Sequence, residues 1–111
     1  MKLLLDECVD ERLRLSFPSH DCVTARFAGL AGLKNGQLLD AAEAAGFDVL
    51  IAVDQNIPHQ QTLGARSISL LILFAATNRL RDLLLLVGPA NDALDSIGHG
   101  AVVAVRQSGN A

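Results

Sequence analysis

The sequence predicts a three-layer α/β/α sandwich around a mostly parallel central sheet. Apolar runs without polar alternation, which are typical of strands buried on both faces, occur near residues 3–5, 49–53 and 70–74. Segments with helical spacing or helix-capping residues lie between such runs, as expected for parallel strands joined by crossover helices. Half of the residues are hydrophobic and only 4% are aromatic, which indicates an aliphatic, well-packed core.

The N-terminal segment predicts a strand, a short helix and a second strand. Residues 2–6 are mostly apolar and form the expected first strand. Residues 10–17 carry apolar side chains at a spacing of four, and Asp10 is a suitable N-cap for a short helix. A proline ends this helix, and β-branched residues within 21–25 predict the second strand.

The middle of the chain predicts a loop, a helix and a third strand. Glycines at three positions of residues 27–36 indicate the loop. Apolar residues in 37–45 follow the i, i+3, i+4, i+7 pattern of a helix, with Asn35 as its expected cap and Gly46 as its stop. The apolar run ending at Val53 predicts a strand over residues 48–53.

Beyond the third strand, residues 57–66 are polar and predict a loop. Residues 67–74 then predict a fourth strand, and a helix is expected to begin at Asn78 as its cap and to continue to Leu86.

The C-terminal part predicts one more helix and a last strand. The pair Gly88-Pro89 is expected to break the preceding helix. A further helix is expected over residues 91–97, and a fifth strand over residues 101–105.

Length, charge and hydropathy limit the class of protein. The 111 residues suffice for one domain, expected to span 1–106, with 107–111 as a disordered tail. The formal net charge of −3 argues against a protein that holds nucleic acid mainly through a basic surface. No apolar stretch reaches membrane-spanning length, and we expect a cytoplasmic protein. Cys8 and Cys22 lack a metal-ligand spacing and are expected to be reduced thiols.

Oxygen-bearing side chains follow the predicted strands at their carboxyl ends. Asp6 and Glu7 follow the first strand, Asp54 and Asn56 the third, and Asn78 lies just after the fourth. Because ligands bind outside the carboxyl ends of parallel strands, these side chains are expected to converge. Hard oxygen ligands suit Mg²⁺ or Mn²⁺. An aspartate at a strand end can also simply cap a turn, and that alternative stays open.

Three stretches together resemble the small PIN-like proteins of the DUF5615 family. They are MKLLLDECVDERL, GLAGLKNGQLLDAAEAAGFDVLIAVDQNIPHQQ and SLLILFAATNRLRDL, and the resemblance covers residues 1–106. It implies a parallel α/β/α sheet with an acidic metal pocket at its carboxyl edge. It also implies a Mg²⁺- or Mn²⁺-dependent ribonuclease, of the kind that often serves as a toxin paired with an antitoxin.

The resemblance assigns roles to particular residues. Asp6 and Asp54 match the family's acidic positions and would be both metal ligands and catalytic residues. Asn35 and Asn56 stand where many relatives carry aspartate, so they would be neutral ligands and the site would bind a cation more weakly. Glu7 could supply a missing charge.

Asp40 and Glu43 could also supply a charge, but their place in the middle of a helix favours a solvated face. Four residues near the expected pocket are candidates for substrate binding, either through phosphate or within a loop: Lys34, His59, Asn78 and Arg79.

The leading functional hypothesis is therefore a PIN-like, metal-dependent ribonuclease that acts as a toxin. The alternative is a catalytically silent PIN-like module that binds RNA or a partner protein, and a small-molecule phosphoesterase is a weaker third option. The leucines at 83–86 give a wide apolar helix surface, which is often core but would also suit a homodimer interface.

Overall fold

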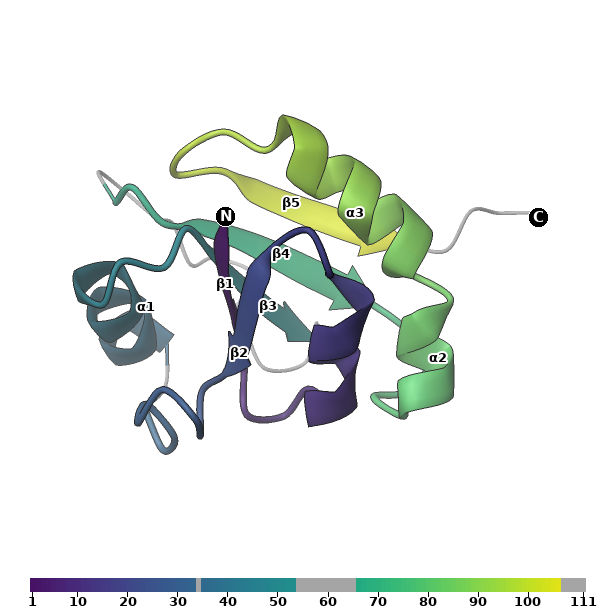
Figure 1. Cartoon of the computed structure of the whole chain (residues 1–111), viewed down its shortest axis with the longest axis horizontal. Coiled ribbons are helices and arrows are strands. Elements are labelled where there is room, and N and C mark those ends of the chain that lie inside the picture. The colour runs from purple at the N-terminus through teal and green to yellow at the C-terminus, as the bar shows by residue number, and fades with distance from the viewer. Residues whose placement is uncertain (34, 54–65, 107–111) are drawn as a thin grey trace.

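The computed structural model describes residues 1–33, 35–53 and 66–106, and its centre is a five-stranded sheet (Figure 1). The strand order is β2-β1-β3-β4-β5, and every neighbouring pair is parallel. This confirms the expected α/β/α architecture, with a sheet that is parallel throughout. The strands are β1 (Lys2–Leu5), β2 (Asp21–Thr24), β3 (Val49–Val53), β4 (Ser69–Phe74) and β5 (Val102–Arg106).

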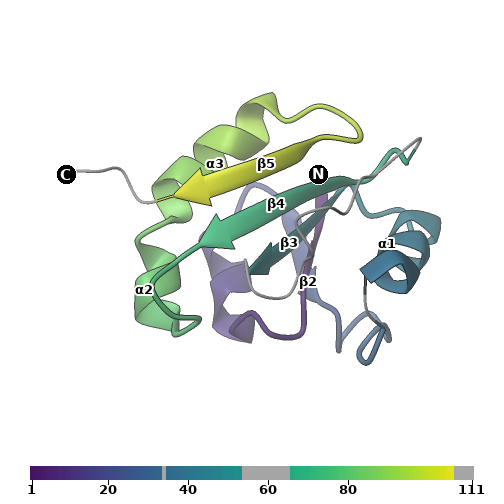
Figure 2. The same cartoon turned by 180° about the vertical axis from the view of Figure 1, so that it is seen from behind.

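Helices cover both faces of the sheet but unequally. The short 3-10 helix η1 lies on the same face as α2 and α3, whereas α1 lies on the opposite face (Figures 1 and 2). None of the helices in the described ranges is long and apolar enough to cross a membrane. The helices are η1 (Glu11–Ser16), α1 (Asn35–Ala44), α2 (Leu80–Leu84) and α3 (Val87–Ser96).

Alternating side chains of the inner strands supply two separate cores. The α3-side core includes Leu5 and Ile51 of the sheet together with Leu13 of η1 and Leu94 of α3. All five residues of β3 are buried, because this strand has a neighbour on each side and helices on each face. Continuous apolar runs therefore mark the inner strands, as the sequence predicts. The α1-side core is formed by the strand side chains that point to the other face, such as Leu4 and Leu50, together with Leu38 and Leu39 of α1.

Two of the expected helix signals act as predicted. The Asp10 side chain caps η1 by accepting a hydrogen bond from the Arg12 backbone N–H at 2.9 Å. Gly46 follows α1 with φ of 87°, a left-handed conformation that favours glycine and ends the helix. Helix α1 itself begins at Asn35, two residues earlier than expected, so Asn35 is its first residue and not the cap that precedes it.

The expected capping role of Asn78 is wrong. Helix α2 begins at Leu80, and Arg79 precedes it without a side-chain cap. Thr77 organises this turn instead: its hydroxyl accepts the Arg79 backbone N–H at 3.0 Å and donates to the Asp82 carboxylate. A hydroxyl one residue earlier therefore takes the local hydrogen bond, which leaves the Asn78 side chain to point elsewhere.

The expected break at Gly88-Pro89 is also wrong, because both residues lie in the first turn of α3. The N–H groups of a first turn have no intrahelical acceptor, so proline loses no hydrogen bond there. Helix α2 instead ends at Leu84, and α3 begins three residues later.

The connection from β4 to β5 has an unusual hand. The β4–β5 connection runs toward the β5 edge of the sheet, whereas the β1–β2 connection runs toward the β2 edge. Both pass over the same face, because η1, α2 and α3 all contribute to the α3-side core. The two must therefore have opposite hands, which is rare for crossovers between parallel strands. As a consequence, α2 and α3 leave the other face of β5 open, and Val102 is 51% exposed there. The Arg106 guanidinium lies 4.0 Å from the ring centroid of Phe74.

Candidate active site

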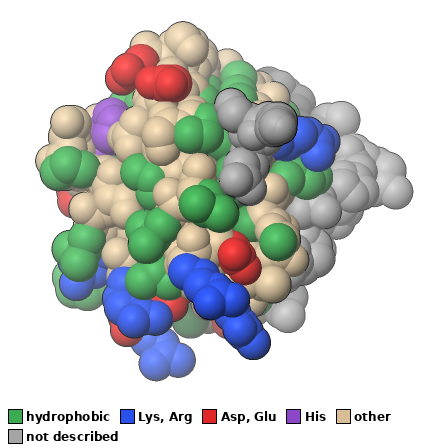
Figure 3. All heavy atoms as spheres, turned by 90° about the vertical axis from the view of Figure 1, so that its right-hand side faces the viewer, with side chains coloured by type: hydrophobic (Ala, Val, Ile, Leu, Met, Phe, Trp, Pro, Cys, Tyr) green, Lys and Arg blue, Asp and Glu red, His purple; other side chains and the backbone are tan. Residues whose placement is uncertain are grey.

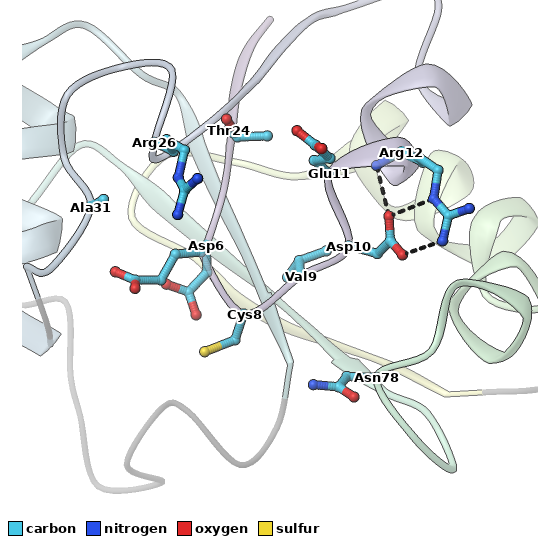
Figure 4. Close-up of a pocket in the computed structure, with 11 residues that line it drawn as sticks. Asp6, Cys8, Val9, Asp10, Glu11, Arg12, Thr24, Arg26, Ala31 and Asn78 are labelled. Carbon is cyan, nitrogen blue, oxygen red and sulfur yellow. Dashed lines mark hydrogen bonds and ion pairs between the residues drawn. The ribbon is translucent and has the colours of Figure 1, made fainter.

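A pocket of about 550 Å³ lies at the carboxyl edge of the sheet, beside the ends of β1 and β2 (Figure 4). The turn between β1 and η1 supplies five of its residues, and the others come from the start of η1, the end of β2, the loop after β2 and the loop before α2. We call it the acidic pocket. Its lining residues are Asp6, Glu7, Cys8, Val9, Asp10, Glu11, Arg12, Thr24, Arg26, Ala31 and Asn78.

Asp6 is the most buried charged residue of the acidic pocket, with 7% of its surface exposed. Its backbone N–H donates to the Ile51 carbonyl at 2.9 Å and so continues the β1–β3 ladder by one residue. Its own carbonyl accepts the Val9 N–H at 2.9 Å, where the chain turns toward η1. A carboxylate in such a position requires compensating charge or hydrogen bonds. The sheet thus fixes an acid at the head of a pocket.

Glu7 connects the end of β1 to the loop after β2. Its Oε1 accepts the backbone N–H of Gly32 at 2.6 Å. Gly32 has a φ of 90°, a left-handed conformation in which a side chain would be strained. The exposed Glu7 side chain therefore holds the loop wall of the acidic pocket and itself lines the cavity.

An ion pair forms the wall nearest to η1. The Arg12 guanidinium donates two hydrogen bonds to the Asp10 carboxylate, at 3.0 Å from Nε and 2.8 Å from Nη2 (Figure 4). These side-chain bonds, followed by the bond from the Arg12 backbone N–H, lower the pKa of Asp10 to about 2. The same partner raises the pKa of Arg12.

The acidic pocket has an excess of negative charge. Among the described residues, four carboxyl side chains line it against two guanidinium groups, and Asp10 balances one of these. Carboxylates gathered in one cavity repel one another unless a cation lies among them. The charge distribution therefore favours a cation or a ligand that carries one.

We expect NMR titration to give the Asp10 carboxyl a pKa of about 2. Because this pKa lies below the ordinary value of 3.8, the group stabilises the fold above about pH 4, and that stabilisation is lost as the pH falls through 2. In Arg12→Gln the pKa should rise toward the ordinary value, since the two guanidinium bonds are absent. An Asp10 pKa that is the same in both proteins would contradict this assignment.

Arg26 is a pocket residue that the sequence analysis missed. It lies two residues beyond the end of β2, and its guanidinium points toward Asp6 (Figure 4). Its carbonyl accepts the Gly29 N–H at 3.2 Å, but its side chain forms no hydrogen bond or ion pair with another described residue. The rule that placed Asp6 at a strand end would have found Arg26 and Thr24 as well, had it been applied to the second strand.

Several predicted site residues lie outside the described part of the chain. These are Lys34, Asp54, Asn56 and His59, together with the side chain of Asn35. Asp54 directly follows Val53, the last residue of β3.

Other predicted residues have clear positions. Asn78 lines the acidic pocket, whereas Arg79 does not. Asp40 and Glu43 lie away from it on α1, where they bind the segment before β4. Asp40 forms an ion pair with Arg66, and Glu43 accepts hydrogen bonds from the backbone N–H and the hydroxyl of Ser67. The bonds from Ser67 lower the pKa of Glu43.

The cysteines of the structure are both free thiols. Cys8 is exposed and lines the acidic pocket. Burial raises the pKa of Cys22 to about 11, so this thiol stays protonated at neutral pH.

The donor set of the acidic pocket suits a hard cation in kind but is incomplete in number. Asp6 and Glu7 offer carboxylate oxygens and Asn78 an amide oxygen, the ligand types that Mg²⁺ and Mn²⁺ prefer. Within residues 1–33, 35–53 and 66–106, no group of three or more histidine, cysteine or acidic side chains could hold a metal ion. A complete cation site would therefore need a ligand from elsewhere, such as the acid expected after β3.

Comparison of the chain with protein-family models, with curated proteins and with solved structures found no match.

Proposed function

We propose that this protein is a ribonuclease that depends on Mg²⁺ or Mn²⁺ and uses the acidic pocket as its active site. One observation carries the proposal: Asp6, a nearly buried acid at the end of an inner parallel strand, opens into a cavity with excess negative charge. This is the location at which α/β proteins of this kind bind ligands. The resemblance to PIN-like proteins supplies the class of reaction.

Each residue would have a distinct role in that reaction. Asp6 and Glu7 would hold the cation, with Asp54 expected as a further ligand and Asn35 and Asn56 as neutral ones. A cation bound there would lower the pKa of a bound water and stabilise negative charge on a phosphoryl oxygen. Asn78 would contact the substrate from the far wall of the acidic pocket. Lys34, His59 and Arg79 stay candidates for contacts outside it.

The proposed setting is the cytoplasm, with an antitoxin protein as the cognate partner. A homodimer is the proposed assembly. Leu83 and Leu86 are buried in the α3-side core, but Leu84 and Leu85 are 47% and 55% exposed and could form part of an interface. Figure 3 shows apolar side chains on the face formed by α2 and α3, above a group of basic side chains.

A silent binding module is the second candidate function. It is favoured by the incomplete donor set among the described residues, because two carboxylates bind a cation weakly without a third. Such a module would bind RNA or a partner protein on the same edge of the sheet without cleaving it.

A cleavage assay on the unmodified chain tests the proposal. The protein is incubated with mixed single-stranded RNA in the presence of Mn²⁺, Mg²⁺ or EDTA. The proposal requires cleavage with either metal and none with EDTA. Binding of RNA without cleavage under all three conditions would establish the silent module instead.

A further inference from the structure

The loop after β2, which lines the acidic pocket through Arg26 and Ala31, also carries an exposed aromatic ring. The chain has no tryptophan or tyrosine, and its aromatic residues are four phenylalanines. Phe17 and Phe47 are buried, and Phe74 lies beneath the Arg106 guanidinium. Phe27 alone among them is largely exposed, at 81%.

The backbone that carries this ring is well fixed. The Phe27 N–H donates to the Thr24 hydroxyl at 3.1 Å, and the Leu30 N–H donates to the Ala25 carbonyl at 2.8 Å. The exposure of Phe27 is therefore a property of an anchored loop. Three apolar side chains of the same loop pack against the α1-side core: Ala28, Leu30 and Leu33.

The residue before Phe27 faces the pocket. Arg26 points its guanidinium toward Asp6 (Figure 4), and it is the guanidinium of the acidic pocket that Asp10 does not bind. A guanidinium with free N–H groups is suited to phosphate oxygens. Two consecutive residues of one loop thus present a phosphate-binding guanidinium toward the proposed catalytic acid and an exposed apolar ring.

We propose that Arg26 and Phe27 form a subsite for one nucleotide of single-stranded RNA. Phe27 stacks on the base and Arg26 binds the phosphate that leads into the acidic pocket. Stacking on an exposed ring requires an unpaired base, so the subsite selects single strands over duplex RNA. This inference rests on the proposed function for its substrate class, but its binding contacts can be tested without cleavage.

The absence of tryptophan and tyrosine makes the ring directly observable. Phe27→Trp introduces one indole at the proposed stacking position, and Leu15→Trp introduces one at a position on η1 that is 68% exposed. We expect a ten-nucleotide oligouridylate to quench the fluorescence of the first variant but not that of the second. Duplex RNA of the same length should quench neither. Equal quenching of the two variants, or none in Phe27→Trp, would overturn the subsite.

Affinity provides the second readout, measured by fluorescence anisotropy in EDTA so that the RNA stays intact. Phe27→Ala and Arg26→Ala should each raise the Kd for the oligouridylate by roughly ten-fold, whereas Leu15→Ala should leave it unchanged. Both tested side chains are exposed, so thermal unfolding should not change. An unchanged Kd in Phe27→Ala, or no binding by the unmodified protein, would refute the inference. Cleavage with Mn²⁺ tests the proposed function separately, because binding that depends on Phe27 can occur without turnover.

Discussion

Asp6→Asn is expected to lower RNA cleavage by roughly a hundredfold or more, since even residues that only support metal ligands contribute 10–100-fold to affinity or activity. An amide keeps the size of the side chain but removes the negative charge that would hold the cation. Calorimetric titration with Mn²⁺ should show the corresponding loss of affinity. Asp6 is the residue at which burial, position at a strand end and pocket lining coincide.

The fold should tolerate this substitution. Asparagine has nearly the same size as aspartate, and the backbone bonds of residue 6 to Ile51 and Val9 do not depend on the side chain. The thermal midpoint of Asp6→Asn without metal should therefore stay close to that of the unmodified protein. Asp92→Asn, an exposed change on α3, is the matched control and should alter neither cleavage nor Mn²⁺ affinity. Full cleavage by Asp6→Asn would exclude the acidic pocket as the active site.

The inner strands could be predicted from the sequence because their environment leaves only one kind of residue acceptable. β3 and β4 have neighbours on both sides and cores on both faces, so nearly every position is apolar. The helices after β4 were predicted less well. Proline breaks a helix when it lies in the interior, because it lacks the N–H that donates along the helix. Pro89 lies in the first turn of α3, where no such hydrogen bond is lost. Whether Pro89 ends a helix or begins one therefore depends on the residue at which the helix starts.

The pocket could be predicted in part. Asp6, Glu7 and Asn78 follow strands whose apolar runs are unmistakable, and all three line the cavity. Arg26 follows β2, an edge strand with exposed and half-buried residues, so its strand end carries a weaker signal in the sequence. The bond from Gly32 to Glu7 and the bidentate Asp10–Arg12 pair depend on loop geometry that no residue pattern specifies. The charge balance of the cavity therefore emerges only in three dimensions.

Leu50→Ala is expected to destabilise the protein by about 3 kcal/mol, a large part of the 5–15 kcal/mol that stabilises a typical domain. Leu50 is fully buried in β3 and belongs to the α1-side core. Removing its branched side chain leaves a cavity between the sheet and α1, which backbone pairing on both sides prevents from collapsing. Urea unfolding followed by circular dichroism measures the loss.

The same substitution should also weaken the site, because the backbone beside Leu50 positions it. The carbonyl of the next residue, Ile51, accepts the Asp6 N–H, so looser packing of β3 weakens the support of the proposed catalytic acid. Leu15→Ala removes the same atoms from a side chain that is 68% exposed, and it should cost less than about 0.5 kcal/mol. Equal destabilisation by the two changes would mean that β3 is not packed as described. A loss at Leu50 alone would show that the strand supporting Asp6 depends on the α1-side core.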